Sequence, residues 1–218
     1  MYKVTGYTNA TTIEVQPISY SSNSLLSAQT NTTDSTIKTK LDSWYKENLI
    51  SYASYLEDTT FCSDRSITSG TGYKVDSYTF YGANTRLQNN KIPSLKCAQE
   101  NDKFKVSSTN AKLNYPVGLI LADEVAFAGG RAYYDGSYSP NSNYYLYNGK
   151  YFWTFSPSNF GHYHSHVSNW KVISSGSLYP WFDLSPSSGV RPVINLKANT
   201  LVTKGDGSSI NPFVVTDK

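Results

Sequence analysis

The chain has 218 residues, a length that fits one large domain or one domain with an appendage and can bury a hydrophobic core without disulfides or metal ions. Its 19 basic and 16 acidic residues give a net charge of +3 without any Lys/Arg cluster, so nucleic-acid binding is not indicated. Only 16% of the residues are charged, below the usual quarter, while Tyr, Ser, Thr and Asn are abundant, a composition common outside the cell.

The N-terminal part predicts strands and then a helix. Residues 2–20 alternate apolar and polar side chains and predict one or two strands, and a polar loop follows over 21–33. We assign residues 1–33 to the same domain or to a linker leading into it. Residues 34–56 predict a helix and a second short helical piece, because Asp34 or Ser35 can cap the start and apolar residues recur at helical spacing.

Residues 58–114 form a long polar stretch with many turn signals, in which we expect few regular elements. The stretch contains both cysteines of the chain, Cys62 and Cys97, each in polar, loop-like sequence. Two interpretations are open, a disulfide or two buried thiols. The polar surroundings favour the disulfide, which would stabilise the fold by about 3 to 4 kcal/mol and place the protein outside the cytosol.

The stretch YPVGLILADEVAFAGG (115–130) predicts a short buried strand and then a helix over 122–128. Gly129 and Gly130 are expected to end this helix. Asp123 and Glu124 lie in its first turn, where the helix dipole favours acidic side chains.

Half of the aromatic residues lie between Tyr133 and Phe182, a region with little charge. We expect strands over 150–157, 167–174 and 189–196, and a closing hairpin over 201–215 around a Gly-Asp-Gly turn. The stretch SLYPWFDLSPSS (177–188) combines aromatic residues with two prolines, which favour a loop. Its aromatic side chains are therefore expected at the surface, whereas four aromatic residues of the strands are expected in the core, namely Phe152, Trp153, Phe155 and Trp170.

Three pieces in this order, LILADEVAFAGG (119–130), YFWTFSP (151–157) and GVRPVINL (189–196), resemble the C-type lectin fold in the variety used by formylglycine-generating enzymes. With FCSDRS (61–66) added, they are similar to prepilin-like or membrane-anchored surface proteins of gut Firmicutes. The resemblance covers about residues 35–216 and includes both cysteines, which supports their pairing.

This resemblance implies an irregular α+β fold with short helices and a small antiparallel sheet, and one ligand-binding domain over residues 34–218. It also implies that Arg191 pairs inside the domain with a carboxylate or a backbone carbonyl. The expected location is the outer surface of a bacterial cell, with a membrane anchor only in a segment outside this chain.

In many such relatives the segment before GVRPV is rich in asparagine, but residues 177–188 contain none. The side chains found there, Trp181 excepted, can arise from Asn codons by changes at adenines, which resembles the variable proteins of diversity-generating retroelements. In those proteins the altered side chains line a ligand-binding face of the same fold. Lys171 and Trp181 cannot arise in this way and need another template codon. The resemblance implies that the loops between 160 and 188 bind the ligand through His162, Tyr163, His164, His166, Ser177, Tyr179, Trp181, Phe182, Asp183, Ser185 and Ser187.

Metal-dependent and enzymatic functions have less support. His162, His164 and His166 alternate, so they could share one face of a strand and hold zinc or copper, but no carboxylate or cysteine lies near them in the sequence. They fit equally well as members of a polar, aromatic binding surface. Formylglycine-type oxidation needs a reactive cysteine pair near the site, and Cys62 and Cys97 lie far upstream. We therefore expect no enzymatic activity, no cofactor and no metal.

The sequence is thus interpreted as a receptor-type domain whose C-terminal loops bind a protein or a glycan on another cell, a phage or a host. Aromatic and hydroxyl side chains would provide the contacts, as they do in antibody-like binding surfaces. The alternative is a structural or adhesive pilin-like subunit without diversification, whose aromatic residues pack against a neighbouring subunit.

Overall fold

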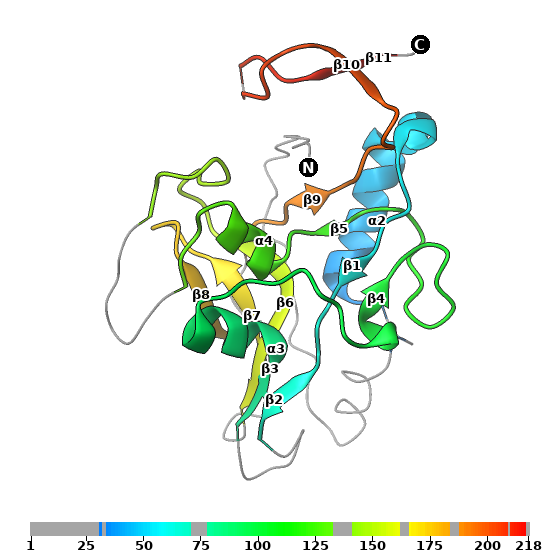
Figure 1. The fold of residues 1–218 in the computed structure, drawn as a ribbon. Coiled ribbons are helices and arrows are strands. Elements are labelled where there is room, and N and C mark those ends of the chain that lie inside the picture. The colour runs from blue at the N-terminus through cyan, green and yellow to red at the C-terminus, as the bar shows by residue number, and fades with distance from the viewer. Residues whose placement is uncertain are drawn as a thin grey trace.

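The computed structural model describes residues 31, 34–70, 78–132, 141–161, 166–183, 188–208 and 210–216, with the backbone alone at 36, 160, 161, 166, 167, 181–183 and 216. This part of the chain is α+β, with short helices and small antiparallel sheets (Figure 1). The strands predicted over residues 2–20 lie outside the described residues.

The predicted N-terminal helix is present as α2 (Thr36–Asn48). Its start is fixed by Ser35, whose Oγ accepts a hydrogen bond from the backbone N–H of Lys38 at 3.1 Å. The apolar stripe of α2 turns inward, so that Leu41, Tyr45 and the following Leu49 are buried. A 3₁₀ helix, η1 (Ile50–Tyr55), follows as the second short helical piece.

Five strands form the central sheet: β2 (Ile67–Ser69), β3 (Thr79–Tyr81), β6 (Phe152–Gly161), β7 (His166–Val172) and β8 (Leu178–Asp183). Their order is β2-β3-β6-β7-β8, and all described neighbours pair antiparallel. The expectation that the aromatic strand ends at Pro157 was wrong, because β6 continues to Gly161. Register shifts on both sides of Pro157 let β6 accommodate a residue that has no N–H to donate.

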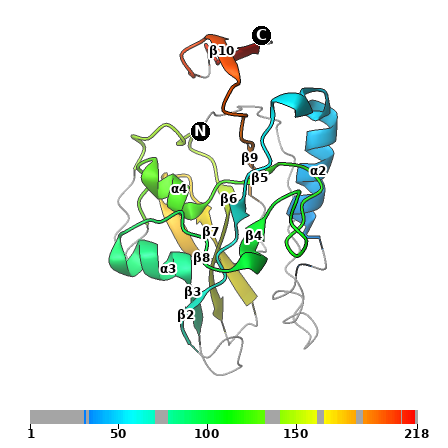
Figure 2. The same ribbon diagram turned by 45° about the vertical axis from the view of Figure 1, so that its right-hand side comes forward.

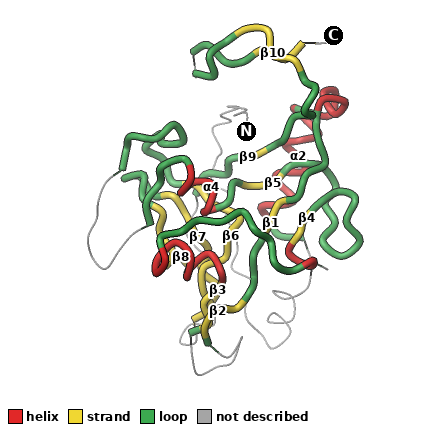
Figure 3. The backbone as a smooth tube through the Cα atoms, viewed as in Figure 1, coloured by secondary structure: helices red, strands yellow, loops and turns green. Residues whose placement is uncertain are grey.

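The described residues also form three two-stranded sheets. β1 (Phe61–Cys62) pairs with β4 (Lys103–Phe104), and β5 (Gly118–Leu119) pairs with β9 (Pro192–Val193). β10 (Leu201–Lys204) and β11 (Val214–Thr216) form the expected C-terminal hairpin, which stands away from the rest of the described chain (Figure 3). The strand predicted over 189–196 is therefore reduced to the two residues of β9.

The remaining helices are short: α3 (Gly82–Asn84), the π-helix η2 (Thr85–Asn90), the 3₁₀ helix η3 (Glu100–Asp102) and α4 (Ala122–Phe127). The described part of the polar stretch 58–114 thus contains only short elements, as expected, although β2 and β3 join the central sheet. α4 ends before Gly129, which adopts φ +107°, a conformation that side chains rarely tolerate.

Hydrophobic side chains pack on both faces of the central sheet. Phe152 and Trp153 are neighbours on β6 and therefore point to opposite faces, Phe152 into the cluster around α4 and Trp153 into the cluster around α2. Figure 2 shows α4 and α2 on different sides of β6. Phe152, Trp153 and Trp170 are at most 1% exposed, which confirms that they belong to the core, while Phe155 is half-buried against it.

A disulfide joins Cys62 in β1 to Cys97, with their Cα atoms 5.8 Å apart, as the sequence favoured. It fixes the segment that leads from η2 to η3 against β1. No described helix is long and apolar enough to cross a membrane.

Candidate ligand-binding surface

The sheet register brings the ends of four strands together. Gly161 at the end of β6 pairs with His166 at the start of β7, and Thr79 at the start of β3 pairs with Phe160. One row further in, Asn159, Ser168 and Asp183 lie side by side on β6, β7 and β8. The described ends of β6, β7 and β8, namely Gly161, His166 and Asp183, therefore lie at the same end of the sheet. This is the lower end of the sheet in Figure 1.

Several predicted ligand-binding residues lie at this end. His166, Phe182 and Asp183 are backbone members of β7 and β8, and Trp181 precedes them on β8. Five of the predicted residues lie outside the described residues, namely His162, Tyr163, His164, Ser185 and Ser187. We name the described residues His166 and Trp181–Asp183, together with the ends of β6 and β7, the distal sheet end.

The expectation that residues 177–188 begin as a loop was wrong, because Leu178–Asp183 form the strand β8. Two features let a strand contain Pro180. β8 is the edge strand of the described sheet, and its pairing with β7 shifts register between Tyr179 and Phe182. Prolines are tolerated at edges and bulges, because fewer ladder hydrogen bonds are required there.

Two of the predicted residues lie away from the distal sheet end. Ser177 is 2% exposed in the turn between β7 and β8, where its carbonyl accepts a hydrogen bond from Ile173 N at 3.0 Å. Tyr179 follows near the same turn and is half-buried. The structure therefore separates Ser177 and Tyr179 from the group that includes His166 and Asp183.

Tyr179 belongs to a row of three residues that cross the sheet. Trp153 on β6, Lys171 on β7 and Tyr179 on β8 are direct register partners and share a face. Lys171 is 2% exposed, and its ammonium nitrogen lies 4.9 Å from the ring centroids of Trp153 and Tyr151. Burial lowers the pKa of Lys171 to about 8, because the charged form loses hydration. This row anchors β7 and β8 next to the turn that joins them.

Buried polar side chains near the distal sheet end form hydrogen bonds between β6, β8 and α3. The Asn159 side chain donates to the carbonyl of Pro180 at 3.3 Å, and Asn84 of α3 donates to Ser158 Oγ at 3.1 Å. Ser168, the partner of Asn159 on β7, is 2% exposed. These hydrogen bonds link β6 to β8 and α3 to β6.

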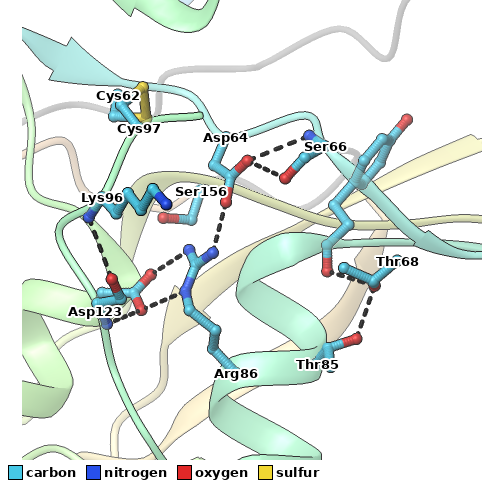
Figure 4. A network of polar contacts seen from close by, with 12 residues as sticks. Cys62, Asp64, Ser66, Thr68, Thr85, Arg86, Lys96, Cys97, Asp123 and Ser156 are labelled. Atoms are coloured by element: carbon cyan, nitrogen blue, oxygen red, sulfur yellow. Dashed lines mark hydrogen bonds and ion pairs between the residues drawn. A yellow bond between two sulfur atoms is a disulfide. The ribbon is translucent and has the colours of Figure 1, made fainter. Parts of the chain in front are cut away.

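An ion network that the sequence reasoning missed lies beside α4 (Figure 4). The Arg86 guanidinium donates to both carboxylate oxygens of Asp123, each at 2.9 Å, and to Asp64 at 2.5 Å. Asp123 also accepts from the backbone N–H of Ser94 at 2.8 Å, and Asp64 accepts from Ser66. Asp123 thus binds Arg86 in addition to lying in the first turn of α4, where the helix dipole favours it.

The charges in this network are paired with one another, as in an ion pair that stabilises a fold. Burial by itself lowers the pKa of Arg86, but the hydrogen bonds and negative charges of Asp123 and Asp64 outweigh it and raise that pKa. Both carboxylates are almost fully buried and paired with the same guanidinium. The network therefore joins η2, α4 and the segment after β1, close to the Cys62–Cys97 disulfide (Figure 4).

Arg191 has the internal role that the resemblance implied. It donates to the backbone carbonyl of Leu146, and its guanidinium carbon lies 3.7 Å from the ring centroid of Phe152. The described residues contain no group of three or more His, Cys, Asp or Glu side chains placed to hold a metal ion. The side chains of His162, His164 and His166 are outside that description.

Comparisons with family models, with curated proteins and with solved structures found no match to this chain.

Proposed function

We propose that this chain is a non-enzymatic, receptor-type domain that binds a protein or a glycan at the distal sheet end. We further propose that the domain has the C-type lectin fold of the formylglycine-generating-enzyme type and that its binding residues are diversified by a retroelement. The proposed location is the outer surface of a bacterial cell, and the disulfide is compatible with it.

The observation that carries the proposal is the register of β6, β7 and β8. This register brings His166 together with Trp181–Asp183, which follow later in the sequence, at the distal sheet end. Gly161 and His166, which flank residues 162–165, also lie at the distal sheet end. Residues 162–165 contain three more of the predicted residues. We propose that a ligand binds at this end of the sheet through His166, Trp181, Phe182 and Asp183.

A second argument is the separation between support and proposed contacts. Among the side chains that the structure describes on β6 and β7, the fully buried apolar ones are Phe152, Trp153, Trp170 and Val172, and Phe152 and Val172 pair at the other end of the sheet. Binding residues on a scaffold stabilised elsewhere can change without loss of the fold. This is the property that a diversified receptor needs.

The proposal is tested by binding to arrays. Labelled wild-type domain is applied to an array of glycans and to an array of bacterial and phage surface proteins. The matched variants are Trp181→Ala with Phe182→Ala, at the distal sheet end, and Ile50→Ala with Tyr52→Ala, on η1, where both side chains are more than half exposed.

The expected result is a set of probes bound by wild type and by the η1 variant but bound at least about tenfold more weakly by the distal variant, a loss of about 1.4 kcal/mol or more. Equal binding by wild type and the distal variant would contradict the proposed site. Wild-type binding no stronger than that of an unrelated domain of the same size, on both arrays, would contradict the proposed function.

A further inference from the structure

The hairpin of β10 and β11 presents apolar side chains to solvent. Leu201 is 47% exposed, Phe213 42%, Val214 44% and Val215 36%, and Ile210 in the connection is 94% exposed. Figures 1 and 2 show the hairpin standing away from the body of the domain. A two-stranded hairpin is at best marginally stable in water, and further strands or a surface packed against it would stabilise it.

The edges of the hairpin differ in how well they are protected. Among the described residues no third strand pairs with β10 or β11, so each has an outer edge of backbone N–H and C=O groups. β10 ends in Lys204, and a lysine on an edge strand discourages pairing with another chain. β11 is Val214, Val215 and Thr216, which has no charge, no proline and no glycine. The edge of β11 is therefore the one open to strand addition.

We propose that β11 pairs antiparallel with β11 of a second copy of this chain, about a two-fold axis through Val215, and so forms a four-stranded sheet. The reason for choosing a second copy as the partner is the strand register inside the hairpin. Because Val202 pairs with Val215, the two-fold pairing creates a continuous row of four valines across the sheet, Val202 and Val215 from each copy. The identical strand is thus its own apolar complement, as an isologous interface requires.

The charges of the hairpin agree with this pairing. Lys204 pairs with Val214, which the two-fold axis places opposite Thr216 of the second copy and, beyond it, opposite Leu201. The Lys204 side chains of the two copies lie on outer strands and in different rows. Pairing therefore puts no like charges directly opposite each other.

The position of the hairpin determines where the two proposed binding sites lie in the dimer. The hairpin and the distal sheet end lie at opposite ends of the described chain, the upper and lower ends in Figure 1. A dimer joined through β11 leaves both distal sheet ends free, and two linked sites bind a multivalent surface more tightly than one. The inference that the chain dimerises does not rest on the proposed function.

The test is sedimentation equilibrium of the full chain between about 1 µM and about 1 mM, the range in which a small interface assembles. We expect a reversible monomer–dimer equilibrium for wild type. Val215→Lys places two ammonium groups opposite each other and should raise the dimer dissociation constant at least about tenfold. Val215→Thr keeps a β-branched residue and Ile50→Lys changes an exposed apolar residue elsewhere, so both should still dimerise.

Val215→Lys could lose dimerisation because its hairpin misfolds, so a second variant tests the same contact in another way. Val215→Cys places two thiols opposite each other across the axis, and mild oxidation should give a covalent dimer, whereas Ile50→Cys should not. A wild-type chain that stays monomeric up to about 1 mM would overturn the inference and favour an extended segment of another protein as the occupant. Unchanged dimerisation of Val215→Lys, or absence of the Val215→Cys cross-link in a dimeric sample, would overturn it too.

Discussion

Replacing Lys171 with methionine should change how the stability of the protein depends on pH. Lys171 is 2% exposed, and burial lowers its pKa from 10.5 to about 8. One pKa unit corresponds to about 1.4 kcal/mol, so burial of the charged form costs the native state about 3 kcal/mol. Methionine has a similar length and no charge, and it can occupy the space between the aromatic rings.

The sign follows from proton binding in the two states. Below pH 8 Lys171 is charged in both the native and the unfolded chain, and the full cost is present. Between pH 8 and 10.5 the unfolded chain keeps the proton that the native state has lost, so the contribution of Lys171 to stability rises with pH. Above pH 10.5 both states are neutral and the cost is gone.

The assay is urea unfolding of wild type and Lys171→Met at several values between pH 7 and 10.5. The stability of the variant relative to wild type should fall by about 3 kcal/mol across this range, because wild type regains stability as Lys171 loses its proton. Other titrating groups are common to both proteins and cancel. Lys150→Met, at an exposed position, is the control for removal of a positive charge. A pH-independent difference for Lys171→Met would refute the reasoning.

Three further variants test which interactions stabilise the fold. Asp123→Ala should lower the free energy of unfolding by about 3 kcal/mol, because it removes two of the guanidinium contacts of Arg86. Replacing Cys62 and Cys97 together by alanine should cost about 3 to 4 kcal/mol, since the disulfide closes a loop with a sequence separation of 35 residues. Gly176→Ala should cost about 2 kcal/mol, because Gly176 has φ +85° and an added Cβ would collide with a neighbouring carbonyl oxygen. All three are measured by chemical denaturation.

Each of these has a matched comparison. Glu100→Ala removes an exposed partner of Lys103 and should cost less than about 1 kcal/mol, so equal losses for Glu100→Ala and Asp123→Ala would contradict the role of the buried network. Gly149→Ala keeps a positive φ in a more open position and should cost less than Gly176→Ala. A cysteine-free chain as stable as the oxidised wild type would show that the disulfide contributes nothing.

Local signals in the sequence were sufficient for several elements. Ser35 and the apolar stripe predicted α2, and the glycines after Ala128 predicted the end of α4. The polar surroundings of the cysteines favoured the disulfide that the structure contains. Each of these depends on residues close together in the chain or on one cysteine pair.

The features that were missed depend on distant partners. Pro180 favoured a loop, but pairing with β7 at a bulged sheet edge makes this segment a strand. Nothing near Asp123 in the sequence indicates that Arg86 and Asp64 join it in one network, because the three residues come from separate parts of the chain. Lys171 alternates with core residues, but only the register with Trp153 explains how a lysine is accommodated in a buried row.

The central claim is that the aromatic residues of the distal sheet end serve binding and do not hold the core together. The most direct measurement is the melting temperature of Trp181→Ala with Phe182→Ala beside that of Trp153→Ala, whose indole is fully buried. Loss of the buried indole should cost about 3 to 5 kcal/mol and lower the melting temperature by about 10 °C. The account expects the distal double variant to melt within about 3 °C of wild type. A fall as large as that of Trp153→Ala would show that these aromatics are core and would contradict the account.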